Sequence, residues 1–385
     1  MAVPKIRFPG FTEDWEQRKL GAIATFLNGR AYKQDELLTS GKYKVLRVGN
    51  FYTNDRWYYS DLELADKFYA DKGDLLYTWS ASFGPHIWLG DKVIYHYHIW
   101  KVVLSEYILK DFALQILEKD KQNILSHPNG STMIHVTKVD MENKQICIPY
   151  LAEQQKIGNF FKYLDETITL HQRKLESMKL LKKSLLQKMF PKSGETVPEV
   201  RFPGFTDAWE QRKFVDFAQR ESTLKLSCSD CPSVEYEDVI AEEGRLNKDI
   251  RQKEIQKTGI YFNGSQVLYG KLRPYLHNWL NPDFTGVAVG DWWVLRPSNM
   301  DKSFLYRLLQ TDQFDAVANQ SSGSKMPRAD WKLVSNTEFI VPHSEKEQHK
   351  IAEFFNSIDD LITLHQRKVE ILHKLKKSLL QQMFV

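Results

Sequence analysis

The sequence lacks the features of secreted, membrane-spanning and disulfide-stabilised proteins. Three cysteines in 385 residues are too few for a disulfide framework, and their scarcity favours a reducing compartment. No apolar run approaches the roughly 20 residues that a membrane-spanning helix needs. Residues 1–5 also lack the apolar core of a signal peptide. We therefore expect a cytoplasmic protein with no membrane contact.

The sequence also lacks a strong excess of charge of one sign. The formal net charge is +4, whereas proteins that grip nucleic acid usually carry a larger global or regional excess. Hydrophobic residues make up 42% of the chain, which is typical of a globular protein with room for two or three domains. Charge alone therefore decides little, and any positive surface must be local.

Candidates for metal binding and catalysis are few. Cys228 and Cys231 have the spacing of half a zinc site, but no second Cys/His pair follows at the spacing of a zinc finger, so we interpret them as a plain loop. Residues 264–271 imitate a phosphate-binding loop, but five residues instead of four separate the glycines, and Leu272 replaces the metal-binding hydroxyl. We interpret this segment as structural.

Two further patterns come close to catalytic motifs. Residues 281–284 (NPDF) approach the Asn-Pro-Pro-aromatic loop of adenine methyltransferases, but Asp283 breaks the pattern and no Gly-rich cofactor turn precedes it. Pro282 and Asp283, with the distant Asp330 and Lys332, have the residue types of a nuclease core, which needs convergent carboxylates. We interpret both as structural and expect no catalytic residue, metal site or cofactor in this chain.

One unit of the sequence is repeated at an offset of 194 residues. Residues 3–19 (VPKIRFPGFTEDWEQRK) return as 197–213 (VPEVRFPGFTDAWEQRK), and residues 153–190 return at the same offset. The first and second variable regions between these copies, residues 20–150 and 214–344, share only faint echoes such as DLLY and QVLY. If mutations had accumulated uniformly after a duplication, the repeated segments and the variable regions would have diverged to the same extent. We therefore infer a common frame that carries two parts selecting different targets.

Each repeated C-terminal segment carries an apolar seam with the spacing of a heptad repeat. The seams are Ile157, Phe161, Leu164, Ile168, His171, Leu175, Met178, Lys182, Leu185 and Met189, and Ile351, Phe355, Ile358, Ile362, His365, Val369, Leu372, Lys376, Leu379 and Met383. No proline interrupts either seam, so we predict two helices, each roughly 55 Å long. We predict that they pair antiparallel, with His171 and His365 at one level, and we favour a role of these histidines in fixing the register over metal binding.

An antiparallel pair has an approximate two-fold axis and carries one variable region near each end. DNA-binding dimers match the separation of their half-sites to the spacing of the protein's own reading elements. Two unlike variable regions therefore predict a split, asymmetric target with a spacer of at most about 16 base pairs. By the same symmetry, we expect residues 3–19 to pack against the end of the second helix, near Met383.

Taken together, these features resemble the specificity subunit of type I restriction-modification systems over the whole chain. The resemblance rests on the FPGFTEDWEQRKLG opening and its repeat, the EQQKI and EQHKI helix starts, LDETI and IDDLI, and helix ends that run from HQRK to KMF or QMF. It implies an α+β fold in which two mixed α/β target recognition domains are separated by two long antiparallel helices with an internal pseudo-two-fold repeat.

The domain boundaries that follow are residues 1–150 for the N-terminal segment and first recognition domain, 151–190 for the first long helix, 191–344 for the linker, repeated segment and second recognition domain, and 345–385 for the second long helix. The resemblance further implies that this chain reads double-stranded DNA without catalysing a reaction. Two modification subunits would dock on it and methylate adenine with S-adenosylmethionine. Restriction subunits, with ATP and Mg, would translocate and cut the DNA.

Residues that read base edges are mostly Arg, Lys, Asn, Gln, Ser and Thr. Side chains of these types, with neighbouring Tyr and His, gather in several polar stretches of each variable region. The candidates are Arg47, Asn50, Asn54, Arg56, Ser80, Ser82, Asn129, Ser131 and Thr132 in the first, and Lys271, Arg273, Tyr275, His277, Asn278, Asn319, Gln320, Ser321, Ser324, Lys325 and Arg328 in the second. Trp79 and Trp279 lie among them but could equally fill a core.

Two alternatives stay open at this point. The chain could be a stand-alone sequence-specific DNA-binding regulator, which would bind DNA tightly without partners. It could also be a coiled-coil scaffold whose variable regions bind proteins, because those regions are close to electrically neutral.

Overall fold

The computed structural model describes residues 3–52, 54–80, 82–126, 136–192, 194–320 and 326–385. The chain divides into two compact units, of which the first comprises Met1–Gln172 and Arg367–Val385 and the second Arg173–Gln366. Each unit combines one variable region with the first half of one long helix and the second half of the other. Among the described residues, no helix is long and apolar enough to cross a membrane.

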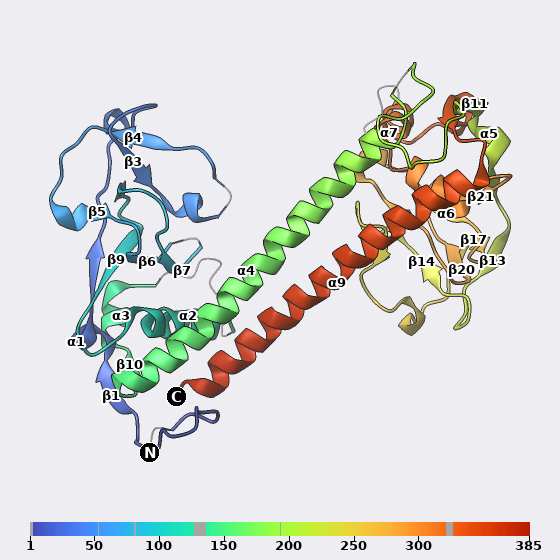
Figure 1. The fold of residues 1–385 in the computed structure, drawn as a ribbon. Coiled ribbons are helices and arrows are strands. Elements are labelled where there is room, and N and C mark those ends of the chain that lie inside the picture. The colour runs from blue at the N-terminus through green and yellow to red at the C-terminus, as the bar shows by residue number, and fades with distance from the viewer. Residues whose placement is uncertain (1–2, 53, 81, 127–135, 193, 321–325) are drawn as a thin grey trace. The chain divides into compact units, whose positions relative to one another are not determined.

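The first unit holds the first variable region between two strands that frame it (Figure 1). Its elements are β1 (Glu16–Lys19), α1 (Leu20–Ile23), β2 (Ala24–Asn28), η1 (Gln34–Glu36), β3 (Tyr43–Leu46), η2 (Val48–Phe51), β4 (Tyr58–Ser60), η3 (Asp66–Phe68), β5 (Tyr69–Ala70), β6 (Leu75–Thr78), β7 (Gly84–Ile87), β8 (Val93–Tyr95), β9 (Ile99–Leu104), α2 (Lys110–Ser126), α3 (Lys138–Asn143), β10 (Gln145–Ile148) and the start of α4 (Leu151–Lys188).

Two four-stranded sheets form the body of the first variable region. One has the strand order β2-β9-β6-β7 and is antiparallel; the other has the order β4-β3-β8-β5 and contains the parallel pair β3/β8. Strand β9 (IWKVVL) consists of β-branched, aromatic and other apolar residues apart from Lys101, a composition that favours a largely buried strand. Its Trp100 packs with Phe26 and Tyr77 against the buried face of α2, where Phe112 is fully buried.

The second unit contains β11 to β22 and the start of the second long helix. Its elements are β11 (Glu210–Lys213), α5 (Phe214–Phe217), β12 (Ala218–Glu221), β13 (Leu224–Leu226), β14 (Ser233–Val234), η4 (Tyr236–Asp238), β15 (Val239–Ile240), β16 (Arg245–Leu246), η5 (Ile250–Gln252), β17 (Thr258–Phe262), β18 (Val267–Gly270), η6 (Pro274–Leu276), β19 (Trp279–Leu280), β20 (Gly286–Ala288), β21 (Trp292–Pro297), α6 (Lys302–Leu308), α7 (Asp312–Ala318), α8 (Trp331–Asn336), β22 (Glu338–Val341) and α9 (Glu345–Met383).

The two variable regions fold alike despite their unlike sequences. In the second region the sheets have the orders β12-β21-β18-β19 and β13-β17-β20-β14, and β14 pairs parallel with β20 as β3 does with β8. The echo between DLLY and QVLY marks the equivalent central strands β6 and β18. These two β-rich domains, each followed by a long helix, confirm the predicted α+β fold.

The two long helices run antiparallel within each unit. In the first unit, Asp165 of α4 pairs with Lys376 of α9 at 2.6 Å, and Gln172 further along α4 contacts His373, which lies earlier on α9. In the second unit, Lys182 of α4 pairs with Asp359 of α9 at 2.7 Å. Both lysines are polar positions of the predicted seams, so ion pairs as well as apolar contacts hold the helices in register.

The repeated segments are bound to the helix starts by a buried ion pair. The Arg7 guanidinium donates two hydrogen bonds to Glu153 (2.7 and 2.8 Å), and the equivalent Arg201 donates to Glu347 at the same distances. Glu153 and Glu347 are almost completely buried. In each helix start the Glu of the Glu-Gln pair (Glu153 or Glu347) therefore balances the charge of the arginine in the repeated segment.

The Gln of each EQ pair ties the helix start to its variable region. Gln154 accepts a hydrogen bond from the backbone N–H of Leu109 and donates to the carbonyl of Pro149. Gln348 makes the same two contacts with Asp301 and Pro342. Buried amides need such complete pairing, so the motif acts as a connector as well as a helix start.

The chain termini meet in the first unit, as the pseudo-symmetry predicts (Figure 1). The backbone N–H of Ile6 donates to the carbonyl of Gln382 at 2.9 Å, and Trp15 packs edge-on against Phe384. The equivalent bond in the second unit joins Val200 to Lys188, also at 2.9 Å. The predicted circular arrangement is confirmed. His171 and His365 fall in different units, so their alignment stays a prediction.

We predict that Glu153→Ala and Glu347→Ala each lower the free energy of unfolding of their own unit by about 3 kcal/mol. Each change leaves a buried guanidinium without its counter-ion, which typically costs about 3–5 kcal/mol. Urea unfolding followed by hydrogen-exchange mass spectrometry would assign the loss to a unit. The exposed Glu16→Ala is the control and should change stability by less than about 1 kcal/mol. Equal stability of all three variants would contradict the prediction.

Candidate nucleic-acid interface

In each variable region, one short turn crosses from one sheet to the other. The first junction turn, residues 96–98, links β8 to β9, and the second junction turn, residues 289–291, links β20 to β21. Backbone hydrogen bonds from His96 to Leu46 (2.9 Å) and from Trp79 to His98 (3.2 Å) anchor the first turn. These bonds bring the ends of β3, β6 and β8 together.

The second junction turn is anchored in the same way. The N–H of Val289 donates to Val234 and that of Lys271 to Asp291, each at 2.9 Å. His98 and Asp291 are therefore structurally equivalent positions, as are Trp79 and Lys271. Polar side chains that the sequence singled out lie next to both turns.

The candidates that follow β3 form one polar loop in the first variable region. The Arg47 guanidinium lies 4.3 Å from the ring centre of Tyr58. The Asn50 amide accepts from the N–H of Arg47 and donates to the carbonyls of Asn54 and Arg56, so it holds the loop together. Asn54 caps the N–H of Arg56, and the Arg56 side chain is exposed.

The candidates that follow β6 lie beside this loop. The Ser82 carbonyl accepts hydrogen bonds from Thr78 and, at 3.4 Å, from the hydroxyl of Tyr52. Ser82 is exposed and Ser80 is half-buried. Burial and the nearby Lys121 lower the pKa of His86, which stacks on Phe51, to about 4. The two polar stretches predicted from the sequence therefore converge at one end of the domain.

Sequence analysis missed the first junction turn itself. The rings of His96, Tyr97 and His98 lie against one another, with centroids 3.9 to 5.0 Å apart, and Trp79 meets His98 edge-on at 4.9 Å. Burial, with the neighbouring His98 and Arg47, lowers the pKa of His96 to about 4. His96 is therefore neutral at pH 7 and can both donate and accept a hydrogen bond. The available signal was the adjacent stretch of residues 78–82 (TWSAS), which contains the predicted candidates Ser80 and Ser82.

Two candidates of the second variable region meet at the second junction turn. The Arg328 Nε and Nη2 atoms donate to the two Asp291 carboxylate oxygens at 3.4 and 3.2 Å, and Lys271 lies 3.5 Å from the same carboxylate. Burial raises the pKa of Asp291, but the hydrogen bond from Arg328 and the charges of both basic groups outweigh it, so the net pKa is lowered. Asp291 was not predicted.

The other candidates of the second region lie along the adjoining loop. Arg273 and Tyr275 are exposed, and Arg273 has a left-handed backbone with φ of 48°. His277 bonds to Asp315 at 2.9 Å, and Asn319 donates to the same carboxylate. Gln320 is exposed, whereas Asn278 is buried. The other predicted residues, Asn129, Ser131, Thr132, Ser321, Ser324 and Lys325, lie outside the described residues.

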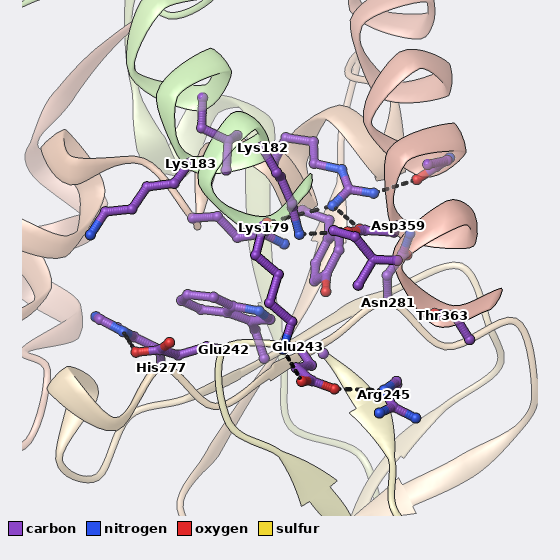
Figure 2. A pocket seen from close by; sticks show the side chains of 18 of the residues that line it. Lys179, Lys182, Lys183, Glu242, Glu243, Arg245, His277, Asn281, Asp359 and Thr363 are labelled. Atoms are coloured by element: carbon purple, nitrogen blue, oxygen red, sulfur yellow. Dashed lines mark hydrogen bonds and ion pairs between the residues drawn. The ribbon is translucent and has the colours of Figure 1, made fainter. Parts of the chain in front are cut away.

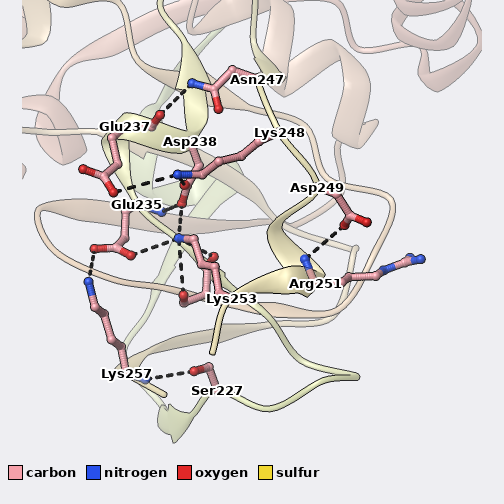
Figure 3. A network of polar contacts seen from close by, with 11 residues as sticks. Ser227, Glu235, Glu237, Asp238, Asn247, Lys248, Asp249, Arg251, Lys253 and Lys257 are labelled. Atoms are coloured by element: carbon pink, nitrogen blue, oxygen red, sulfur yellow. Dashed lines mark hydrogen bonds and ion pairs between the residues drawn. The ribbon is translucent and has the colours of Figure 1, made fainter. Parts of the chain in front are cut away.

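Three lysines of the second variable region, Lys248, Lys253 and Lys257, form ion pairs in a polar network (Figure 3). Asp238, fully buried, pairs with Lys248 at 2.9 Å and also with Lys253. Glu235 pairs with Lys253 and Lys257. Glu235 and Asp238 take the positions of Arg47 and Asn50, because both pairs close the same cap at the end of β3 or β14. The equivalent loops thus differ in charge.

A cavity of about 920 Å³ lies between α4, α9 and the β15–β16 hairpin of the second unit. Figure 2 shows the Glu243 carboxylate between Lys179 and Arg245, at 2.8 and 2.7 Å. Gln366 of α9 donates to the same carboxylate at 2.8 Å. The lining has more carboxylates than basic groups, so it would repel a phosphate backbone. We interpret it as the joint between hairpin and helices.

The weak metal and phosphate patterns gain no support. Cys228 and Cys231 form an isolated β-bridge in a tight turn, and both are free thiols. Residues 267–270 form β18, a central strand, instead of a loop that opens a helix. Within the described ranges, no group of three or more His, Cys, Asp or Glu side chains could hold a metal ion.

The sequence matches the family described as "Type I restriction modification DNA specificity domain" twice, over residues 12–180 and 207–374. The type I restriction enzyme MjaVIII specificity subunit of Methanocaldococcus jannaschii is 25% identical over 395 residues, covering 96% of this chain and 91% of that protein. The EcoDI specificity subunit of Escherichia coli is 24% identical over 281 residues, covering 65% and 63%.

Solved structures share the fold. The S subunit of a type I system from M. genitalium aligns with a TM-score of 0.63 and 16% identity over 100% of this chain and 99% of that one. A chain from a structure on complex assembly and conformational transition of the type I R-M system aligns with a TM-score of 0.54 and 14% identity, over 99% of both chains.

The family match covers most of the chain, and each of its two copies contains one variable region with its helix. Sequence selection is the role of such a subunit, whereas the catalytic activities of the system belong to its modification and restriction subunits. The chain belongs to the DNA specificity subunits of type I restriction-modification systems and has two target recognition domains.

Proposed function

We propose that each variable region reads one half of a bipartite, asymmetric site in double-stranded DNA, and that the paired helices set the distance between the halves. The observation that carries this proposal is a repeated frame with two unlike reading surfaces. The buried connectors are the same in both units, whereas the polar groups at the junction turns differ. A common frame with unlike surfaces suits a reader of two different half-sites.

Local charge supports the position of each reading surface. Arg47 and Arg56 lie in the first loop, and Lys271, Arg273 and Arg328 surround the second junction turn, where Asp291 is the opposing carboxylate. Phosphate contacts from such residues would set the register of the protein on the duplex. Ser80, Ser82, Asn54, Tyr275 and Gln320 would complete the two surfaces, while Asn50, His277 and Asn319 position their neighbours.

Exposed leucines support a docking surface for two modification subunits. Leu170 of α4 and its equivalent Leu364 of α9 are 64% and 60% exposed, and Leu181 and Leu375 form a second equivalent pair. Contiguous exposed apolar patches mark interaction sites, and the recurrence of these leucines at equivalent positions of both helices makes them candidates for the centre of such a patch. Because each pair has one member per unit, two copies of one partner would find the same surface.

The partners would supply the chemistry. Modification subunits would methylate an adenine in each half-site with S-adenosylmethionine, and restriction subunits would use ATP and Mg to translocate and cut the DNA. The complex would act on DNA in the cytoplasm. Neither a stand-alone regulator nor a protein-binding scaffold accounts as simply for a repeated frame with two unlike surfaces.

The proposed function is tested by expressing the chain with the modification methyltransferase of the same restriction-modification system in a host free of adenine methylation. Single-molecule sequencing would map the methylated adenines. A split, asymmetric motif methylated once in each half is the expected result. An unchanged methylation pattern despite a stable complex would overturn the proposal.

We predict that Arg273→Ala weakens or changes the sequence preference in the second half-site and leaves the first half-site unaltered. Its exposed guanidinium follows Lys271 on the same loop, where loss of a base or phosphate contact would affect one half alone. The same mapping measures the effect. Arg296→Ala, which removes an exposed arginine of β21 paired with Glu221, is the matched control. Equal changes in both halves would contradict the prediction.

We predict that Leu170→Glu combined with Leu364→Glu abolishes binding of modification subunits while both units remain folded. A charge at the centre of an apolar contact must be desolvated without a partner, which is costly. Size-exclusion chromatography of the co-expressed proteins would measure complex formation. Lys183→Glu, at an exposed position of α4 that is turned roughly 140° around the helix axis from Leu170, adds negative charge away from this face and should leave the complex intact. A full complex with the leucine variant would contradict the assignment.

A further inference from the structure

The two junction turns occupy the same place in the fold but carry different chemistry. Backbone bonds to the ends of equivalent strands anchor both turns, so positions 98 and 291 correspond closely. The first turn is His-Tyr-His and the second Val-Gly-Asp. A position that the fold fixes and the sequence varies is suited to determine what each domain recognises.

The backbone of the first turn is held by several different segments. Besides the bonds to Leu46 and Trp79, the N–H of Tyr97 donates to Arg30 at 3.1 Å, and that of Ile99 donates to His96 at 2.9 Å. The Trp79 indole donates to the carbonyl of Tyr97 at 2.8 Å. Side chains on such an anchored turn lose little conformational entropy when they bind, which favours affinity and selectivity.

The side chains of the first turn are suited to contact bases. Tyr97 is 39% exposed, and its ring lies against those of His96 and His98 rather than in the core. Aromatic rings and the neutral imidazole of His96 offer apolar contact with a base and also hydrogen-bond donors and acceptors for base edges. The contribution of such groups would be selectivity more than general affinity.

The second turn organises basic side chains instead. Asp291 holds the Nε and Nη2 side of Arg328, which leaves the edge that carries Nη1 outside this pair. Bidentate contact from an arginine edge to O6 and N7 of guanine is the commonest specific contact with a base pair. Gly290 has φ of 98°, and a Cβ added there would meet no atom within 4 Å, so no ring occupies the space that Tyr97 takes in the first turn.

We propose that the junction turns determine the specificity of the two half-sites: Tyr97 and His98 contact bases of the first, and Asp291 positions Arg328 and Lys271 for bases of the second. This inference rests on the proposed function and adds the residues that select the bases. Asp291 acts through its two basic neighbours and is therefore a positioning residue.

The test uses the full chain with its modification subunit, and the probe is the genomic DNA of a host free of adenine methylation. The variants are Asp291→Asn, Asp291→Glu, and Tyr97→Ala with His98→Ala; Asp230→Asn, at an exposed carboxylate of the second region, is the matched control. Methylation of the wild-type motif is compared with that of sites changed at one base pair.

Asp291→Asn should lower discrimination at one or more base pairs of the second half-site by about tenfold and leave the first half-site unchanged. Tyr97→Ala combined with His98→Ala should lower discrimination at base pairs of the first half-site and leave the second half-site unchanged. Asp291→Glu keeps a carboxylate and should largely restore the second preference. The control should match the wild type.

Outcomes that overturn this inference differ from those that overturn the proposed function. A wild-type complex without a bipartite motif would refute the proposed function. A wild-type bipartite motif with unaltered discrimination in all variants would refute the role of the junction turns alone. Loss of assembly in both the Asn and Glu variants would assign Asp291 to folding and would also refute that role.

Discussion

The antiparallel pairing of α4 with α9 is the constraint on which the rest of the structure depends. Each compact unit contains half of both helices, and the first unit completes its core with Leu380, Met383 and Phe384 from the other end of the chain. Apolar seam residues of both helices belong to one core in each unit, and Lys182–Asp359 and Lys376–Asp165 fix the register of the pair. Burial lowers the pKa of Lys182 although Asp359 opposes the shift, so this charge depends on a well-placed partner.

The buried polar groups at the helix starts follow from that pairing. A helix that contacts its partner, its variable region and a repeated segment has one face of its first turns buried, which in α4 includes Glu153 and Gln154. Glu and Gln satisfy the arginine of the repeated segment and the backbone of the variable region through defined hydrogen bonds, which an apolar surface could not direct. The variable regions can therefore change in sequence while these connectors hold them in place.

The frame could be predicted from the sequence because its signals are local or duplicated. Heptad spacing and a constant offset of 194 residues predict the helices, their antiparallel pairing and the meeting of the termini. The strands of the variable regions could not be located with the same precision. They are short, and in each region they are divided between two sheets. The turn at residues 96–98 forms a site only because the ends of β3, β6 and β8 meet in the folded domain. No periodicity in the sequence predicts this meeting.

The same reasoning explains why residue type alone identified a mixture of surface and supporting groups. Asn50 has the side chain of a base reader, yet three hydrogen bonds within its own loop use that amide. Lys248 and Lys253 look suited to phosphates, yet they neutralise a buried Asp238. Conversely, Asp291 carries a negative charge that the DNA backbone repels, but its carboxylate orients Lys271 and Arg328, which DNA attracts. A buried or paired polar group uses its hydrogen bonds within the protein and cannot offer the same bonds to a ligand. A recognition surface therefore consists of the polar groups whose hydrogen bonds the fold leaves available.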